Sequence, residues 1–160
     1  MSRVRVILGQ QRSEMSGVEG EYKARCVLGG HDFRTTDGRP ARELFQEVSG
    51  SPSAMNSSRG VLGAGALLGD QVSVRDAESA YIQASINKPG RPQTWVKLPR
   101  DLHPAEWCKN GACIYQEPVV FLDEAFYGHP ESGALWECHL SSRLKQNGWK
   151  PITEHPGLYR

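Results

Sequence analysis

The sequence has no long hydrophobic run and no marked excess of charge of either sign. Its longest apolar stretch, residues 61–68, contains glycines and is far shorter than the roughly 20 residues that a membrane-spanning helix needs. The formal net charge is +1, with 19 Lys plus Arg against 18 Asp plus Glu, which gives no overall attraction for nucleic acid. We therefore expect no membrane association, and any nucleic-acid site must depend on the local placement of basic residues.

The sequence also has few cysteines and no leader pattern. The first residues lack a sustained apolar core after their arginines, so we expect no signal peptide and an intracellular chain, cytoplasmic or nuclear, with free thiols. His103, Cys108 and Cys113 form an H-x4-C-x4-C pattern, which leaves a small zinc-binding domain as an alternative. These spacings are wider than those of typical zinc knuckles, so four free thiols remain the expectation.

No internal repeat is visible, and the 17 glycines and 10 prolines fall between short periodic segments. This distribution favours one α+β domain with many turns. Apolar and β-branched runs predict strands at residues 4–8, 22–28, 94–98 and 119–122, the first two as a hairpin.

Helical spacing of apolar residues predicts three helices. They cover residues 41–48, residues 55–68 with Asn56 or Ser57 as N-cap and Gly69 as the stop, and residues 131–146. In the last of these, Trp136, Leu140 and Leu144 recur on one face, and Asn147-Gly148 ends the helix.

Asp76 follows a predicted strand, residues 71–74, and precedes a segment of helical composition, residues 77–84. If the extended backbone continues, Asp76 and Glu78 point the same way, as a metal-binding pair requires. The alternative is that Asp76 is only the N-cap of the helix that follows it.

A series of segments in fixed order resembles the reverse transcriptase domain of copia-type retrotransposons. KARCV is similar to the family's KARLV, VRDAESAYI to its segment with DVKTAF, and FYGHP to its LYGLKQ. LWE, NGWK and PGLY near the end are similar to its W-x-x-x-L, GF and DPSLY. The resemblance covers residues 21–160, and residues 1–20 are then an N-terminal strand and loop.

The chain departs from the family's pattern at several positions. Glu78 and Ser79 replace a lysine-threonine pair, Tyr81 replaces a phenylalanine, and Gly133 stands where proline is usual. These differences make a diverged or lost activity an open alternative.

The resemblance implies an RNA-directed DNA polymerase that uses two Mg²⁺ ions for nucleotidyl transfer. Its fold would be the fingers and first part of the palm, with an antiparallel sheet backed by helices. Asp76 would be the catalytic carboxylate that binds Mg²⁺, and the backbone of Ala77 would lie beside the metal and triphosphate. Tyr81 would exclude a ribose 2′-hydroxyl, although a tyrosine packed on the core is an equal alternative.

The resemblance also assigns the rest of a deoxynucleoside triphosphate site. Lys23 and Arg25 would meet the triphosphate from a finger strand, and Tyr127 and Gly128 would border the nucleotide pocket. The alternatives are a solvated strand face for the two cations and a simple turn for Tyr127 and Gly128.

The 160 residues contain no Tyr-x-Asp-Asp sequence, the segment that carries the family's second carboxylate pair. We therefore expect this chain to be inactive alone and to need the downstream half of the polymerase, together with an RNA or DNA template-primer. The alternative is a non-catalytic binding module derived from a retroelement, or a pseudogene product.

Overall fold

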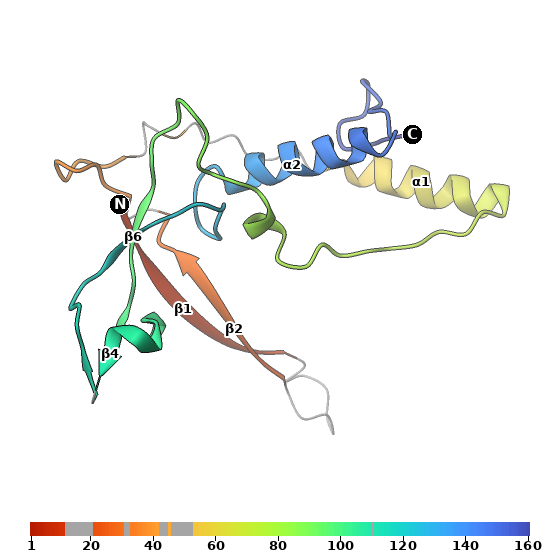
Figure 1. Cartoon of the computed structure of the whole chain (residues 1–160). Helices are drawn as coiled ribbons and strands as arrows, with labels where there is room; N and C mark the ends of the chain where they lie inside the picture. Colours follow the sequence, from red (N-terminus) through yellow and green to blue (C-terminus); the bar gives the residue numbers. More distant parts are fainter. Residues whose placement is uncertain (12–20, 31–32, 42–44, 46–52, 110) are drawn as a thin grey trace.

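The fold is α+β, with a four-stranded sheet and two α-helices (Figure 1). The computed structural model describes residues 1–11, 21–30, 33–41, 45, 53–109 and 111–160. The strands follow the order β2-β1-β3-β6, and they are β1 (Ser2–Gln11), β2 (Glu21–Leu28), β3 (Trp95–Lys97) and β6 (Val119–Phe121).

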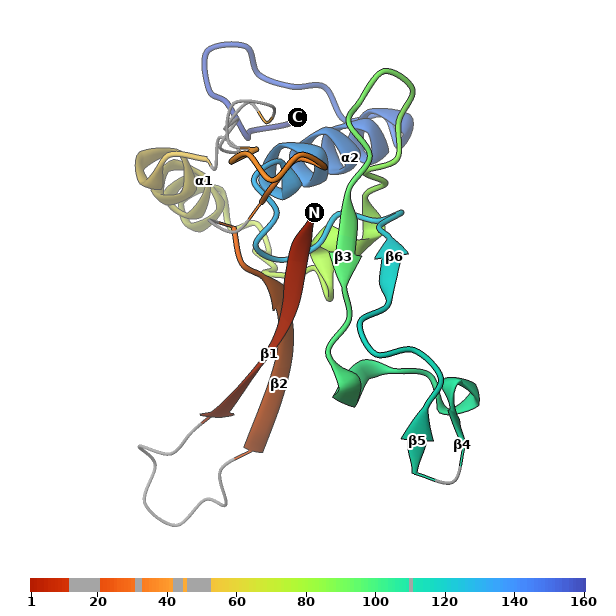
Figure 2. The ribbon, with the colours of Figure 1, turned by 90° about the vertical axis from the view of Figure 1, so that its left-hand side faces the viewer.

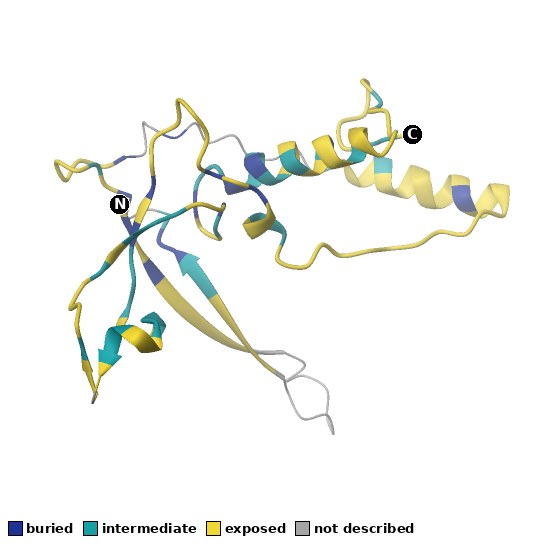
Figure 3. Ribbon diagram, in the orientation of Figure 1, coloured by how far each residue is buried: buried dark blue, intermediate teal, exposed yellow. Residues whose placement is uncertain are grey.

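The predicted hairpin is confirmed as an antiparallel ribbon formed by β1 and β2, with Val4 opposite Leu28 at one end. That end is buried, whereas the far end of the ribbon projects away from the rest of the chain (Figures 1 and 3). Val6 is 41% exposed and Leu8 is 74% exposed, so the apolar face of the ribbon is covered only near its base.

The resemblance implied an antiparallel sheet, and two of the three pairings are antiparallel, but the third makes the sheet mixed. β1 pairs with β3 in parallel, with Ser2 opposite Val96, while β3 pairs with β6 in antiparallel fashion. The long connection from the end of β2 to β3 allows β3 to lie parallel to β1, because parallel neighbours need a crossover of at least a dozen or so residues.

Two apolar clusters form the core, and Leu122 contacts both. The first lies on the sheet, and its buried members are Val4, Leu28, Phe33, Ala41, Phe45 and Val96. The second lies where α2 meets the short segment after Tyr81, and its buried members are Ala84, Ile86, Ala125 and Leu135.

The predicted helix at residues 55–68 is confirmed as α1 (Met55–Leu68), and Gly69 ends it in the left-handed conformation, with φ of 73°. The predicted cap was wrong. Ala54 is the N-cap, because its carbonyl accepts hydrogen bonds from the backbone of Ser57 and Ser58. Most of α1 is exposed, and Gly65 is its only buried residue (Figure 3).

The predicted helix at residues 131–146 is confirmed as α2 (Ser132–Gln146), followed by Asn147 and a left-handed Gly148. Its buried residues are Ser132 and Leu135, near the N-terminal end. The predicted apolar face was therefore only partly right, since Leu140 is 41% exposed.

Two predicted elements around Asp76 were wrong. Residues 71–77 form neither strand nor helix, and the helix expected at residues 77–84 is reduced to a 3-10 turn, η2 (Ala80–Gln83). Without a neighbouring strand to pair with, the short alternating run cannot satisfy its backbone groups as a strand does. The helix expected at residues 41–48 falls largely outside the described residues.

Residues 98–118, which we call the distal arm, leave the sheet after β3 and return at β6 (Figure 2). The arm contains η3 (Arg100–Leu102), η4 (Ala105–Trp107) and a small hairpin formed by β4 (Cys108–Lys109) and β5 (Ala112–Cys113).

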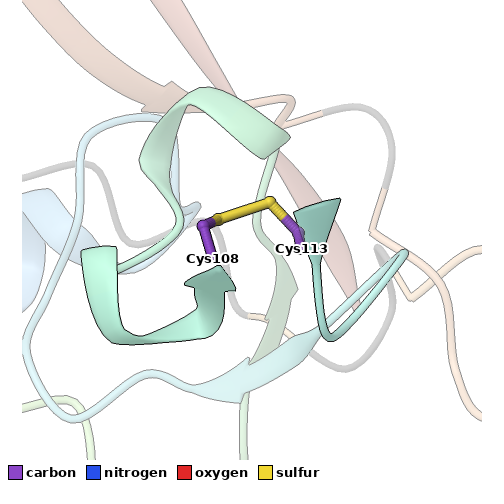
Figure 4. Close-up of a disulfide and its surroundings, with 2 residues drawn as sticks. All are labelled: Cys108 and Cys113. Atoms are coloured by element: carbon purple, nitrogen blue, oxygen red, sulfur yellow. A yellow bond between two sulfur atoms is a disulfide. The ribbon is translucent and has the colours of Figure 1, made fainter. Parts of the chain in front are cut away.

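The expectation of four free thiols was wrong for two of them. Cys108 and Cys113 lie opposite each other in the hairpin, with Cα atoms 4.1 Å apart, and they form a disulfide (Figure 4). Cys26 and Cys138 are free.

Among the described residues, no helix has the length and apolar character needed to cross a membrane.

Candidate functional site

Two tyrosines that are far apart in the sequence meet beside the second apolar cluster. Tyr81 lies in η2, and Tyr127 lies in the loop before α2. Their ring centroids are 4.7 Å apart, and the rings are tilted by 50°. Tyr81 is half-buried, while Tyr127 is 38% exposed, so the pair presents aromatic surface at the edge of the core.

Tyr127 and Gly128 form the middle of a turn closed by a 3.0 Å hydrogen bond from the His129 N–H to the Phe126 carbonyl. Gly128 has a φ of 85°, which favours glycine over any other residue. A Cβ atom on Gly128 would also overlap the Leu28 carbonyl oxygen at the end of β2. The predicted turn is therefore confirmed, and it needs glycine for both conformation and space.

Hydrogen bonds hold this turn at both ends. The Leu28 N–H donates to the Tyr127 carbonyl at 2.7 Å, which joins the turn to strand β2. At the start of α2, the Ser132 hydroxyl donates to the Phe126 carbonyl at 2.7 Å and accepts from the Phe126 N–H at 3.0 Å. Tyr127 is thus positioned by a strand on one side and by a helix on the other.

His129 is buried directly behind the turn. Its Nδ1 accepts a hydrogen bond from the Glu131 N–H, so its Nε2 carries the hydrogen that faces Thr94 Oγ1 at 3.2 Å. The rings of Phe33 and Phe45 contact its ring edge-to-face. Burial, reinforced by the positive charges of Arg91 and the N-terminus, lowers the pKa of His129 to about 4. His129 is therefore a neutral structural residue near pH 7.

Asp76 lies on the exposed connection between α1 and η2. It does not cap a helix, because η2 begins at Ala80 and its N-cap is Ser79. Asp76 makes no hydrogen bond or ion pair within the described part of the chain. The alternative explanation of Asp76 as a helix cap was therefore wrong.

Glu78 does not extend a strand beyond Asp76, because it lies in a turn before Ser79, which has a left-handed φ of 51°. The Glu78 carbonyl accepts a 2.7 Å hydrogen bond from the Gln83 side chain. Ala77, between the two acidic residues, is exposed. Among the described residues, no group of three or more metal-ligating side chains includes Asp76.

Lys23 and Arg25 are exposed on β2, and their alternation places them on one face of the ribbon. The register puts Arg25 opposite Ile7 and Val27 opposite Arg5, so Arg5 lies on the same face. Arg3 follows by the same alternation and forms a 3.5 Å ion pair with Glu117. This basic face, made of Arg3, Arg5, Lys23 and Arg25, gives the nearly neutral chain a local concentration of positive charge.

The sequence-predicted residues thus fall into three groups in space. Tyr81, Tyr127 and Gly128 come together, and the hydrogen bond to Leu28 connects them to the strand that carries Lys23 and Arg25. Asp76 and Ala77 lie in the exposed segment that leads into η2.

Sequence reasoning missed the structural role of His129. A histidine between glycine and proline carries no local sign of burial, because the phenylalanines that cover it come from residues 33 and 45. It also missed the pairing of Cys108 with Cys113. The Asn110-Gly111 pair between them, a common hairpin signal, was the available indication.

The chain matches no protein-family model, no curated protein and no solved structure. Its function must therefore be argued from the geometry of its own residues.

Proposed function

We propose that the chain is the fingers and first palm part of a copia-type reverse transcriptase, and that it contributes a deoxynucleoside triphosphate site. Asp76 binds Mg²⁺ in this proposal, and the carboxylate pair that completes two-metal catalysis comes from polymerase residues outside these 160. Lys23 and Arg25 contact the triphosphate of the incoming nucleotide.

The contact between Tyr81 and Tyr127 is the observation that carries the proposal. Two segments assigned to the nucleotide pocket on sequence resemblance alone lie against each other, with ring centroids 4.7 Å apart. An exposed aromatic ring can stack on a base or a sugar, and a half-buried ring beside it can restrict the space around the 2′ position. The left-handed Gly128 brings backbone close to the same place.

Asp76 supports the proposal in a second way. An exposed carboxylate that caps no helix and has no partner among the described residues is available to a divalent cation. Because Mg²⁺ keeps several waters and bridges to substrate phosphates, one protein carboxylate and a bound triphosphate are enough for a first binding event.

The test is equilibrium binding of fluorescent deoxy- and ribonucleoside triphosphates to the full chain, with and without Mg²⁺. We expect Mg²⁺-dependent binding that prefers the deoxynucleotide. Tyr127→Ala should weaken it by about tenfold, in line with the loss of one aromatic stacking contact. Tyr81→Ala should bring the two affinities closer together, and Asp76→Asn should remove the dependence on Mg²⁺.

Tyr22→Ala is the matched control, because Tyr22 is a 77% exposed tyrosine on the opposite face of the ribbon from Lys23 and Arg25. It should bind nucleotide as the unmodified chain does. Equal affinity for the two sugars, or binding that does not respond to Mg²⁺, would contradict the proposal.

The basic face of the ribbon favours a second candidate, a non-catalytic module that binds single-stranded nucleic acid. Positive side chains on one face of a projecting ribbon can contact successive phosphates without any metal. Replacing Lys23 and Arg25 together by alanine should then make the slope of log affinity against log salt concentration less steep. The change should correspond to the loss of about two phosphate contacts. Such binding without nucleotide binding would favour this second function over the first.

A further inference from the structure

Three metal-ligating side chains meet in the distal arm. The β4–β5 hairpin of this arm extends away from α1 and α2 (Figures 1 and 2). One ligand atom each from His103, Cys108 and Cys113 lies within 4.8 Å of the others. The two cysteines face each other across the β4–β5 hairpin (Figure 4). His103 lies just before η4, the turn that leads into Cys108.

His103 has an unusual environment for a histidine. Both of its ring nitrogens are buried, and neither has a hydrogen-bond partner among the described residues. Its ring contacts Trp107 edge-to-face, with centroids 5.9 Å apart, which gives it apolar contact but no polar one. A buried polar atom without a partner costs about 1–3 kcal/mol, and coordination of a metal would remove that cost.

The distal arm also lacks a core of its own. Among residues 98–109 and 111–118, none is buried, although Leu98 and Leu102 pack against the sheet cluster. Its internal contacts include a Trp107–Tyr115 ring pair at 5.3 Å and a 2.8 Å hydrogen bond from the Ile114 N–H to the Trp107 carbonyl. Segments with so little buried surface usually depend on a disulfide or a metal.

We propose that His103, Cys108 and Cys113 bind one zinc ion when the disulfide is reduced, so that the arm is held by a disulfide in one redox state and by zinc in the other. Two thiolates and one imidazole are a ligand set that zinc prefers, and the fourth position remains open to water. This zinc would hold the arm together, and it is independent of the Mg²⁺ site in the proposed function.

The exchange is balanced in atoms and electrons. A dithiol reductant transfers two electrons and two protons to the Cys108–Cys113 bond, which yields two thiols and the disulfide of the reductant. Zinc then displaces both thiol protons, forms two Zn–S bonds and accepts a lone pair from one nitrogen of His103.

The movement that this requires is small. With Zn–S bonds of about 2.3 Å and a Zn–N bond of about 2.0 Å, tetrahedral geometry places the three ligand atoms about 3.5–3.8 Å apart. The existing cluster, within 4.8 Å, contracts slightly around the metal while the two sulfur atoms separate. Both cysteines already lie opposite each other in one hairpin, with Cα atoms 4.1 Å apart.

The test compares the oxidised full chain with the same chain reduced by a phosphine, which does not itself bind zinc strongly. Zinc affinity is measured by competition with a chromophoric chelator, and cobalt is used as a spectroscopic substitute. We expect one zinc per reduced chain, a thiolate-to-cobalt charge-transfer band, and no binding to the oxidised chain. His103→Gln should weaken zinc binding by at least about tenfold, and C108S/C113S should abolish it.

C26S/C138S and His155→Gln are the matched controls, because they remove cysteines and a histidine outside the cluster. Both should bind zinc as the unmodified chain does. Trypsin cleavage after the exposed Lys109 gives a readout that needs no variant: reduction should accelerate it, and zinc should slow it again. A reduced chain that binds no zinc, or zinc affinity unchanged in His103→Gln, would overturn the proposal.

Discussion

At the scale of single residues, Gly128 allows the turn before α2 to lie directly against the end of strand β2. Its left-handed backbone and its close approach to the Leu28 carbonyl both exclude a side chain. We expect Gly128→Ala to lower the free energy of unfolding by about 3 kcal/mol or more, measured by urea denaturation.

Gly90→Ala is the control for that prediction. Gly90 also has a left-handed φ, 80°, but a Cβ there would meet no atom within 4 Å. Gly90→Ala should lower the free energy of unfolding only by the backbone strain of a left-handed alanine, about 1 kcal/mol. Equal losses in the two variants would show that the contact with Leu28 contributes nothing.

His129 makes stability depend on pH. Its pKa falls from 6.5 to about 4 on folding, so between these values the unfolded chain binds a proton that the folded chain rejects. The stability from this residue is complete above pH 6.5 and is lost as the pH falls towards 4. Between pH 7 and pH 5 the loss should be about 2 kcal/mol.

Urea denaturation at several pH values, on the unmodified chain and on His129→Gln, measures this effect. Glutamine can replace a hydrogen bond but does not titrate, so the variant should lose less stability on acidification. His155→Gln should keep the pH dependence of the unmodified chain, since His155 is exposed. The same acid loss in all three proteins would contradict the assignment.

At the scale of elements, α1 is a helix with little to pack against. Gly63 is exposed with open space around it, whereas a Cβ on Gly65 would lie 2.6 Å from a methyl carbon of Val72. Gly63→Ala should raise stability by about 0.5–1 kcal/mol, because glycine costs conformational entropy within a helix. Gly65→Ala should gain less. Thermal unfolding followed by far-UV circular dichroism distinguishes them, and equal gains would contradict the Gly65–Val72 contact.

The elements were predicted well where a pattern acts within one segment. Alternating residues and apolar spacing identified the β1–β2 hairpin, both helices and the glycines that end them. The prediction for the segment around Asp76 was wrong for a physical reason. Its short alternating run has strand composition, but strands also need a neighbour, and no described strand pairs with it.

At the scale of the whole molecule, the proposed function assigns Asp76 to a polymerase metal centre, but the 160 residues contain no Tyr-x-Asp-Asp pair. We expect purified chain to extend no primer on RNA or DNA templates, even with Mg²⁺, because two-metal catalysis needs the additional carboxylates. A radiolabelled primer assay measures this. Primer extension that disappears in Asp76→Asn would show that this chain completes the centre with other residues.

The candidate site was predictable in composition but not in arrangement. The segments that resemble the family in a fixed order pointed to Tyr81, Tyr127 and Gly128. The contact between the two tyrosines, however, depends on packing between η2 and the start of α2. The concentration of positive charge on one face of the ribbon was also not predictable from the sequence. It depends on the β1–β2 register, which puts Arg5 on the same face as Lys23 and Arg25.

The sequence by itself determined the α+β class, the small net charge of +1 and the positions of the main helices and the hairpin. These follow from periodicity and composition, which act over a few neighbouring residues. Only the tertiary structure decided the parallel pairing of β1 with β3, the burial of His129 and the meeting of His103 with Cys108 and Cys113. The first two depend on contacts between segments far apart in the sequence, and the third depends on how η4 and the β4–β5 hairpin fold together.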